Sequence, residues 1–249
     1  MKILILCAGI GSRLGSYTAN NPKCLVKVNS ISILDRLLNQ LDNLGLDKNN
    51  IFLCGGYKHE LLPSKYKRFI NEDFIYTNMM KTTILGLDGL IKSNNVYENI
   101  LIIYGDCIYS NEFISEIVRN LESFKEITIP VDLDWNKKWG ERYENIYEDA
   151  ETLEYDKSNN KLISIGGKTF IENQYMAQFM GIYSIPKLII NNFISKFKNL
   201  PNKTQNKIST TEFFQKTIKE LNYYVIPDKY IWTEIDTIDD LLYAKKIFI

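Results

Sequence analysis

The chain contains a single histidine, His59, and its four cysteines are scattered without paired spacing. One histidine cannot build a histidine-rich metal centre, and isolated cysteines favour reduced thiols over a disulfide framework or a zinc site. Basic and acidic residues balance at 30 each, so the chain lacks the basic excess that binds nucleic acid. No apolar run is long enough for a membrane span or a secretory core. We therefore expect a cytoplasmic protein that binds neither nucleic acid nor a membrane.

The rest of the composition and the hydrophobic pattern predict an α/β fold. The chain has 249 residues, of which 45% are hydrophobic and 24% charged, enough for a sizeable core. Short apolar strands alternate with segments of helical periodicity. We expect strands at 2–7, 51–54, 74–77, 99–104 and 126–131, and helices at 32–44, 79–91 and 112–122. This order predicts a Rossmann-like, doubly wound and mostly parallel sheet.

The pattern changes after residue 131. Residues 132–184 are polar, acidic and aromatic, and we interpret them as a β-rich insertion that covers the site. Its strand-like pieces lie at about 146–155, 161–166 and 176–184. Residues 185–249 follow, with helices at 187–199, 210–221 and from 238, and strands at 223–226 and 231–235. Residues 1–131 are expected to form the ligand-binding core. No linker or repeat divides the chain, so 1–249 is expected to be a single domain. No pattern specifies an oligomeric state.

The most informative segment is a glycine turn after the first strand. There the chain reads Ala8-Gly9-Ile10-Gly11-Ser12-Arg13-Leu14, followed by Pro22-Lys23. Glycines let backbone N–H groups approach phosphate oxygens, and Arg13 and Lys23 add positive charge. The spacing is not that of a P-loop, and Leu14 stands where a dinucleotide fingerprint has its third glycine. An ordinary strand-to-helix turn explains the glycines alone, but not their combination with Arg13 and Lys23.

Two aspartates are expected beside this turn. Asp106 follows the apolar strand 99–104, and ligands of an open parallel sheet bind beyond the carboxyl ends of its strands. Asp236 also ends an apolar strand, although Thr237-x-x-Asp240 is a capping box, so Asp236 could equally serve to start a helix. Because Mg²⁺ takes one or two carboxylates together with phosphate oxygens, Asp106 and Asp236 are candidate metal ligands.

In these residues the chain resembles the nucleotidyltransferases that activate sugar phosphates, phosphocholine and related phospho-acids. The resemblance rests on the Ala8–Leu14 loop, Pro22-Lys23-Cys24-Leu25, Gly105-Asp106 after the central strand, and Asp236 before the last helix. It implies that a phosphate oxygen of the acceptor attacks the α-phosphorus of a nucleoside triphosphate, with Mg²⁺ as cofactor and release of pyrophosphate.

Further segments are similar to the phosphocholine and phosphonate cytidylyltransferase branch, so the resemblance covers nearly the whole chain and implies CTP as the nucleotide. These segments are Leu53–Tyr57, Asn78-Met79-x-x-Thr82, Arg142–Glu151, Ile165–Lys168 and Gln178–Gly181. The chain departs from the branch at Gly166-Gly167-Lys168, which holds an extra glycine, and at Gln178, which replaces a usual glutamate. Both departures concern the acceptor rather than the chemistry.

The charges and the resemblance together suggest a role for each residue. We expect Lys23 at the α-phosphate, Arg13 and the amides of Gly9–Ser12 at the β- and γ-phosphates, and Mg²⁺ on Asp106 and Asp236. The expected catalytic residues are Lys23, Arg13, Asp106 and Asp236. The expected nucleotide-binding residues are Cys7, Ala8, Gly9, Gly11, Ser12, Arg13, Lys23, Gly55, Gly56, Thr82 and Asp106. Candidate acceptor-binding residues are Asn78, Arg142 and Lys168, although Arg142 and Lys168 are equally explained as solvated surface charges.

The sequence leaves the acceptor open. Phosphocholine would require an aromatic cage, and Trp135, Trp139, Tyr143, Tyr147 and Tyr175 could either form one or simply pack. A phosphorylated amino acid of the phosphoglutamine type, used in surface-polysaccharide modification such as a capsule, is the other main option from the resemblance. A sugar 1-phosphate is a further alternative. A non-catalytic nucleotide-binding regulator is the alternative of another class, but a mere binder would need neither Asp106 nor Asp236.

Overall fold

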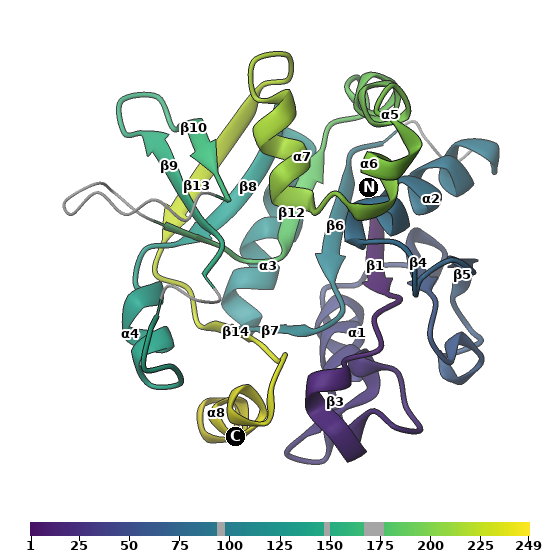
Figure 1. Ribbon diagram of the computed structural model, residues 1–249, viewed down its shortest axis with the longest axis vertical. Helices are drawn as coiled ribbons and strands as arrows, with labels where there is room; N and C mark the ends of the chain where they lie inside the picture. The colour runs from purple at the N-terminus through teal and green to yellow at the C-terminus, as the bar shows by residue number, and fades with distance from the viewer. Residues whose placement is uncertain (94–97, 147–149, 167–176) are drawn as a thin grey trace.

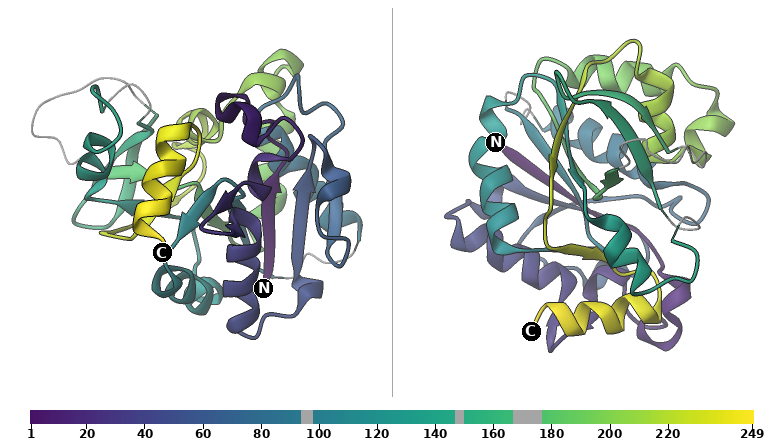
Figure 2. Two further views of the ribbon diagram at one scale, coloured as in Figure 1. Left: turned by 90° about the horizontal axis from the view of Figure 1, so that it is seen from below. Right: turned by 90° about the vertical axis from the view of Figure 1, so that its left-hand side faces the viewer.

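The computed structural model describes residues 1–93, 98–146, 150–166 and 177–249 (Figure 1). In these residues a ten-stranded sheet crosses the molecule in the order β11-β9-β10-β13-β8-β12-β6-β1-β4-β5. Helices lie on both of its faces (Figures 1 and 2). This is the Rossmann-like α/β architecture that the alternating sequence pattern predicts.

Four strands from the N-terminal half of the chain run parallel to one another at one side of the sheet. In spatial order they are β6 (Ile100–Tyr104), β1 (Lys2–Cys7), β4 (Ile51–Gly55) and β5 (Lys67–Ile70). The first three are almost entirely buried apolar runs, as expected for parallel strands covered on both faces. Their carboxyl ends meet at one edge, where Cys7 lies in register with Gly55.

The β-rich part of the chain extends this same sheet. β8 (Ile127–Asp132) and β13 (Tyr223–Asp228) run parallel to each other, and β12 (Ile182–Ile185) is inserted antiparallel between β8 and β6. The far edge consists of β9 (Thr152–Asp156), β10 (Lys161–Ile165) and β11 (Ala177–Phe179). The sheet is therefore mixed rather than mostly parallel as expected: the strands around β1 and the β8–β13 pair are parallel, whereas β9–β12 pair antiparallel with their neighbours.

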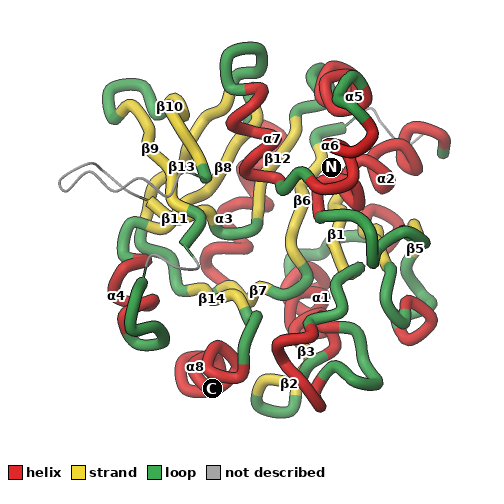
Figure 3. Tube along the Cα trace, in the orientation of Figure 1, coloured by secondary structure: helices red, strands yellow, loops and turns green. Residues whose placement is uncertain are grey.

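The helices begin where the sequence supplies polar caps. Ser32 Oγ accepts the N–H of Asp35 at 3.0 Å and so opens the first long helix, as the sequence predicts. The two last described helices open with capping boxes, Ser209 with Glu212 and Thr237 with Asp240. The α-helices are α1 (Ile33–Asn43), α2 (Met79–Lys92), α3 (Asn111–Asn120), α4 (Trp135–Gly140), α5 (Ile190–Lys198), α6 (Asn202–Lys207), α7 (Thr210–Thr217) and α8 (Ile238–Ile247). Figure 3 shows their distribution around the strands. No helix in the described ranges is both long and apolar enough to cross a membrane.

The strand predicted at residues 74–77 is wrong. The edge strand lies earlier, at β5, and residues 72–76 form a turn. Asn71 closes this turn: its Oδ1 accepts the N–H of Asp73 at 3.2 Å and its Nδ2 donates to Thr77 Oγ1 at 2.9 Å. Asparagine and aspartate favour such turns because their side chains bond to nearby backbone groups.

A small two-stranded sheet beneath the main one brings distant parts of the chain together. β7 (Cys107–Tyr109) pairs antiparallel with β14 (Trp232–Glu234), and Ile235 N donates to the Asp106 carbonyl at 3.0 Å. Another short antiparallel pair is formed by β2 (Lys27–Val28) and β3 (Ile31–Ser32). A second apolar core fills this region, formed by Leu14, Val26, Val28, Ile33, Ile108, Ile235, Leu241, Ala244 and Phe248. It joins the glycine turn to α8.

Candidate active site

The glycine turn lies at the carboxyl end of β1 and opens to solvent. Gly9, Ser12 and Arg13 are exposed. Gly11 has a φ of 69°, and a Cβ at this position would lie 2.9 Å from Cγ of Lys23. Only glycine combines that backbone conformation with so close a contact. At Gly9, by contrast, no described atom outside Gly9 and its two chain neighbours lies within 4 Å of where a Cβ would stand, so the space beside it is available to a ligand.

Lys23 lies at the centre of the site, on a short 3₁₀ turn that begins directly after Pro22. Its Nζ donates to Asp106 Oδ2 at 2.7 Å and also to Asp236 Oδ1. Burial would lower the pKa of Lys23, but the carboxylates of Asp106 and Asp236 raise it well above its ordinary value. The side chain is therefore a fixed positive charge at neutral pH.

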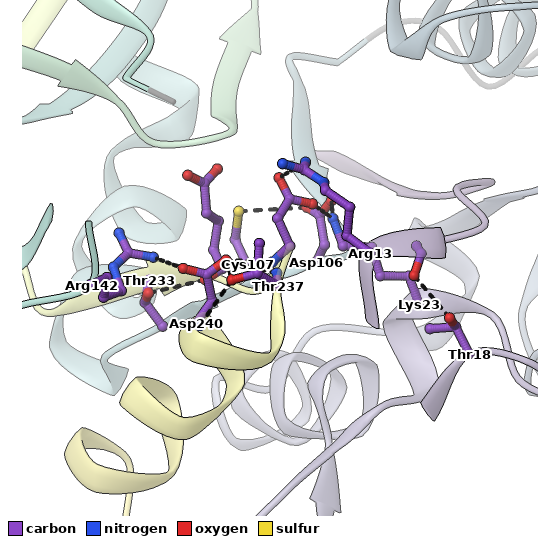
Figure 4. A network of polar contacts seen from close by, with 12 residues as sticks. Arg13, Thr18, Lys23, Asp106, Cys107, Arg142, Thr233, Thr237 and Asp240 are labelled. Atoms are coloured by element: carbon purple, nitrogen blue, oxygen red, sulfur yellow. Dashed lines mark hydrogen bonds and ion pairs between the residues drawn. The ribbon is translucent and has the colours of Figure 1, made fainter. Parts of the chain in front are cut away.

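The two aspartates reach this charge from different strands. Asp106 links β6 to β7, Asp236 follows β14, and the pairing of β7 with β14 sets them side by side. Arg13 Nη2 makes an ion pair with Asp236 Oδ2 at 2.8 Å. Burial would raise the pKa of Asp236, but Lys23 and Arg13 outweigh it and hold that pKa below its ordinary value. The structure thus brings all four expected catalytic residues into one network, most of which Figure 4 shows from close by.

The donor set fits a magnesium ion. Both carboxylates converge on a single cationic group, the Lys23 ammonium, and Mg²⁺ prefers one or two carboxylates with substrate phosphates and water. Within the described ranges, no cluster of three or more His, Cys, Asp or Glu residues could hold a metal by itself. Asp106 and Asp236 would therefore hold the ion together with phosphate oxygens of a bound nucleotide.

A narrow pocket opens between the glycine turn and α2. Its volume is about 60 Å³, far below the roughly 300–1,000 Å³ of a cleft that encloses a whole ligand. The pocket is therefore too small to enclose a whole ligand. Its lining includes several expected nucleotide-binding residues and is formed by Leu6, Cys7, Ala8, Gly9, Lys23, Cys24, Met79, Thr82, Gly105 and Asp106.

Thr82 faces this pocket from α2 and is held there by a residue that sequence reasoning missed. Its Oγ1 accepts a hydrogen bond from Asn71 Nδ2 at 2.9 Å, and the Asn71 backbone N–H donates to the Gly55 carbonyl at 2.8 Å. A polar residue directly after an edge strand is the available signal, but the sequence pattern places that strand at 74–77 instead of at β5. Gly56 allows the neighbouring turn to approach, since a Cβ there would lie 2.8 Å from the Ala8 carbonyl oxygen.

The acceptor candidates do not join the charged network. Asn78 caps α2: its Oδ1 accepts the N–H of Met79 at 2.7 Å, and its Nδ2 donates to the Lys207 carbonyl at 3.1 Å. Lys168 lies outside the described residues. Arg142 is not a solvated surface charge, because its side chain is 1% exposed and paired with Asp240 at 2.5 Å.

Of the five aromatic residues considered for a cage, three lie within the described residues. Trp135 and Trp139 are buried, and Trp139 packs against Trp232 with ring centroids 5.6 Å apart. These two tryptophans are therefore core packing. Tyr143 donates its hydroxyl to Asp240 at 3.0 Å. Tyr147 and Tyr175 lie outside the described residues.

Residues 3–164 match the family of the MobA-like NTP transferase domain. This chain belongs to that family. The CTP:phosphoglutamine cytidylyltransferase of Campylobacter jejuni is 30% identical over 254 aligned positions, which cover 97% of this chain and 98% of that protein. The resemblance to nucleotidyltransferases that the glycine turn indicated is confirmed, and the enzymes of this family include cytidylyltransferases.

Solved structures confirm the fold of this NTP transferase. The CTP:phosphocholine cytidylyltransferase of Streptococcus pneumoniae superposes with a TM-score of 0.70 at 21% identity, over 100% of this chain and 99% of that one. The inositol-1-phosphate CTP transferase of T. maritima superposes with a TM-score of 0.71 at 17% identity, over 99% and 95%. At these identities the likeness concerns the Rossmann-like architecture.

Proposed function

We propose that this nucleotidyltransferase transfers CMP from CTP to a small phosphorylated acceptor of the phosphoglutamine type and releases pyrophosphate. The observation that carries the proposal is the network of Lys23 and Arg13 with Asp106 and Asp236, beside a solvent-open glycine turn. Identity of 30% along almost the full length of both chains with the C. jejuni enzyme supports CTP and phosphoglutamine. From the sequence resemblance we also expect the product to serve surface-polysaccharide modification.

The reaction has to bring two anions together. The acceptor phosphate is already negatively charged, so it needs no general base, and positioning and charge stabilisation carry most of the rate. Lys23 supplies a permanently charged ammonium where the α-phosphate would lie, because it is seated beside the glycine turn. Arg13 is largely exposed, with 57% of its side chain accessible, and with the amides of Gly9–Ser12 it would hold the β- and γ-phosphates.

The carboxylates of Asp106 and Asp236 would hold Mg²⁺, which when bound neutralises phosphate charge and orients the triphosphate. In the structure both carboxylates are paired with Lys23. When nucleotide binds, the phosphates offer Lys23 other partners, and the carboxylates are then released for the cation. The ion pairs thus keep the site neutral before the substrate arrives.

A substrate screen tests this function. Pyrophosphate release is measured with CTP, UTP, dTTP, ATP and GTP, each combined with phosphoglutamine, phosphocholine and glucose 1-phosphate in the presence of Mg²⁺. We expect the highest kcat/KM for CTP with phosphoglutamine. A preference for glucose 1-phosphate would establish the sugar-phosphate alternative. Binding of CTP without pyrophosphate release from any acceptor would establish the non-catalytic regulator and refute the proposal.

A further inference from the structure

Asp240 is completely buried at the start of α8 and accepts hydrogen bonds on both of its oxygens. Oδ2 accepts the backbone N–H of Asp236 at 3.0 Å, the backbone N–H of Thr237 at 2.8 Å and the Thr237 hydroxyl at 2.9 Å. Oδ1 accepts from Arg142 Nη1 at 2.5 Å and from the Tyr143 hydroxyl at 3.0 Å. Figure 4 shows Arg142 pointing toward Asp240 from the side opposite Arg13 and Lys23.

A capping box alone does not account for this arrangement. In the box that opens α7, Glu212 is exposed and its carboxylate bonds the Ser209 backbone N–H. In the box that opens α8, the Asp240 carboxylate is buried and also accepts the backbone N–H of Asp236, one residue before the N-cap. It forms an ion pair with Arg142, which comes from another part of the chain. The extra contacts fix the backbone that carries the Asp236 side chain.

The guanidinium of Arg142 is packed against aromatic rings. Its guanidinium carbon lies 4.2 Å from the centroid of the Trp139 ring and 5.3 Å from that of the Tyr243 ring. The side chains of Arg142 and Asp240 are 1% and 0% exposed. Removing two charges from water costs free energy that their attraction often only just offsets, so a buried pair is weak evidence for stability. A planar, stacked guanidinium instead gives a fixed orientation.

We propose that Arg142 and Asp240 are positioning residues for Asp236. They hold its backbone so that its carboxylate stays beside that of Asp106, where the two together bind the divalent cation. The inference rests on the proposed function, in which Asp236 is a metal ligand. Arg142 follows α4 and belongs to the segment before β9, so the pair also ties the β-rich part of the protein to the helix that follows the metal ligand.

Mn²⁺ binding tests the positioning role without turnover. Affinity is measured by electron paramagnetic resonance with a non-hydrolysable CTP analogue, for the intact chain and for Arg142→Gln, Arg142→Lys and Asp240→Asn. Partners behind a metal ligand typically contribute about 10–100-fold in affinity. We expect losses in that range for Arg142→Gln and Asp240→Asn, and a smaller loss for Arg142→Lys, which keeps the charge but not the planar group. If Asp240→Asn fails to fold, the two arginine variants carry the test.

Lys138→Met is the matched control. Close to Arg142, the partly exposed Lys138 makes an ion pair with the buried Asp132. Its removal leaves Asp132 with hydrogen bonds from Trp232 Nε1 at 2.9 Å and from the Asp134 N–H at 3.0 Å. None of these bonds reaches Asp236. We expect Lys138→Met to lower the melting temperature as Arg142→Gln does, but to leave Mn²⁺ affinity within about twofold, well below the range of outer partners.

Two results overturn the inference, and they are distinguishable. If Arg142→Gln and Lys138→Met change Mn²⁺ affinity equally, the Arg142–Asp240 pair is only structural, and the proposed function stands. If Asp236→Ala binds Mn²⁺ as tightly as the intact chain, Asp236 is not a metal ligand, and the metal site of the proposed function fails together with the positioning role.

Discussion

Lys23 and Asp106 are 83 positions apart in the chain, and their charged groups meet at 2.7 Å. Asp236, near the other end of the chain, contacts the same ammonium. Two cations and two anions therefore neutralise one another at the carboxyl ends of β1 and β6. Each of these groups has a partner that a triphosphate and a divalent cation would replace.

Metal binding to the nucleotide-free protein should become tighter in Lys23→Met. The Lys23 ammonium occupies the space between Asp106 and Asp236, and its removal leaves two carboxylates without this competing cation. We expect the Mn²⁺ dissociation constant to fall several-fold in Lys23→Met, measured by calorimetry. Weaker Mn²⁺ binding in this variant would show that the ion does not compete with Lys23 and would contradict the shared position.

The two glycines of the turn should respond differently to alanine. In Gly11→Ala the residue must keep a φ of 69° and its Cβ meets the Lys23 stem, so we expect a loss of stability of about 1–2 kcal/mol. Lys23 would also be displaced, and a displacement of about 1 Å can lower kcat roughly 10²-fold. Gly9→Ala meets no described atom, so it should melt like the intact chain.

For Gly9→Ala the expected effect is on nucleotide binding. A methyl group there would keep phosphate oxygens away from the turn, so we expect KM for CTP to rise while the melting temperature stays constant. Both quantities are obtained from steady-state kinetics and a thermal melt of the same preparation. An unchanged KM would mean that the triphosphate does not approach the turn at Gly9.

The stability of the ligand-free protein should depend on Asp236 only above acidic pH. Lys23 and Arg13 hold its pKa below the ordinary value, against the effect of burial, so its contribution is present above about pH 4 and is lost as the pH falls through the folded-state pKa. Lys23, whose pKa is raised, contributes fully below about pH 10.4 and is lost only at higher pH.

Urea unfolding of the intact chain and of Asp236→Asn from pH 3 to pH 8 measures this contribution. The difference in unfolding free energy should be constant between about pH 5 and 8, and should shrink as the pH falls below the ordinary aspartate pKa of about 3.9. A difference that grows on acidification would mean that the pKa of Asp236 is raised in the folded state, and the ion-pair account would be wrong.

Nucleotide binding should stabilise the protein selectively. A ligand at about 100 times its Kd adds roughly 2.7 kcal/mol to the unfolding free energy, so CTP with Mg²⁺ should raise the melting temperature more than ATP or GTP at equal concentration. In Asp106→Ala the part of the shift that requires Mg²⁺ should disappear, while any metal-independent part remains. Equal shifts for all nucleotides would remove the basis for CTP.

Much of the site could be predicted from the sequence because its residues follow strand ends. The glycine turn, Lys23 and Asp106 lie directly after or near apolar strands, and their types are those that phosphate and metal require. The meeting of Asp106 with Asp236 could not be derived in the same way. It depends on the pairing of β7 with β14, two three-residue strands that are too short for a periodic pattern to show.

Expectations for individual segments failed where contacts between distant parts of the chain decide the structure. Arg142 is polar and lies in a polar segment, so only its packing against Trp139 and Asp240 reveals that it is buried. The run Phe74–Thr77 has strand-like residues, but Asn71 bonds to Thr77 and closes a turn there. The antiparallel insertion of β12 between β6 and β8 is a choice of topology that local pattern does not specify.

The turnover of Lys23→Ala with CTP and the preferred acceptor shows whether the Lys23 ammonium stabilises the reacting phosphates. The control is Lys27→Ala, which removes an exposed lysine four residues away on β2. Pyrophosphate release is followed for both variants and the intact chain, with folding checked by circular dichroism. The loss of one charge-stabilising group lowers kcat roughly 10²-fold or more, so we predict such a loss for Lys23→Ala and near-normal kcat for Lys27→Ala. Near-normal turnover in a folded Lys23→Ala would contradict the account.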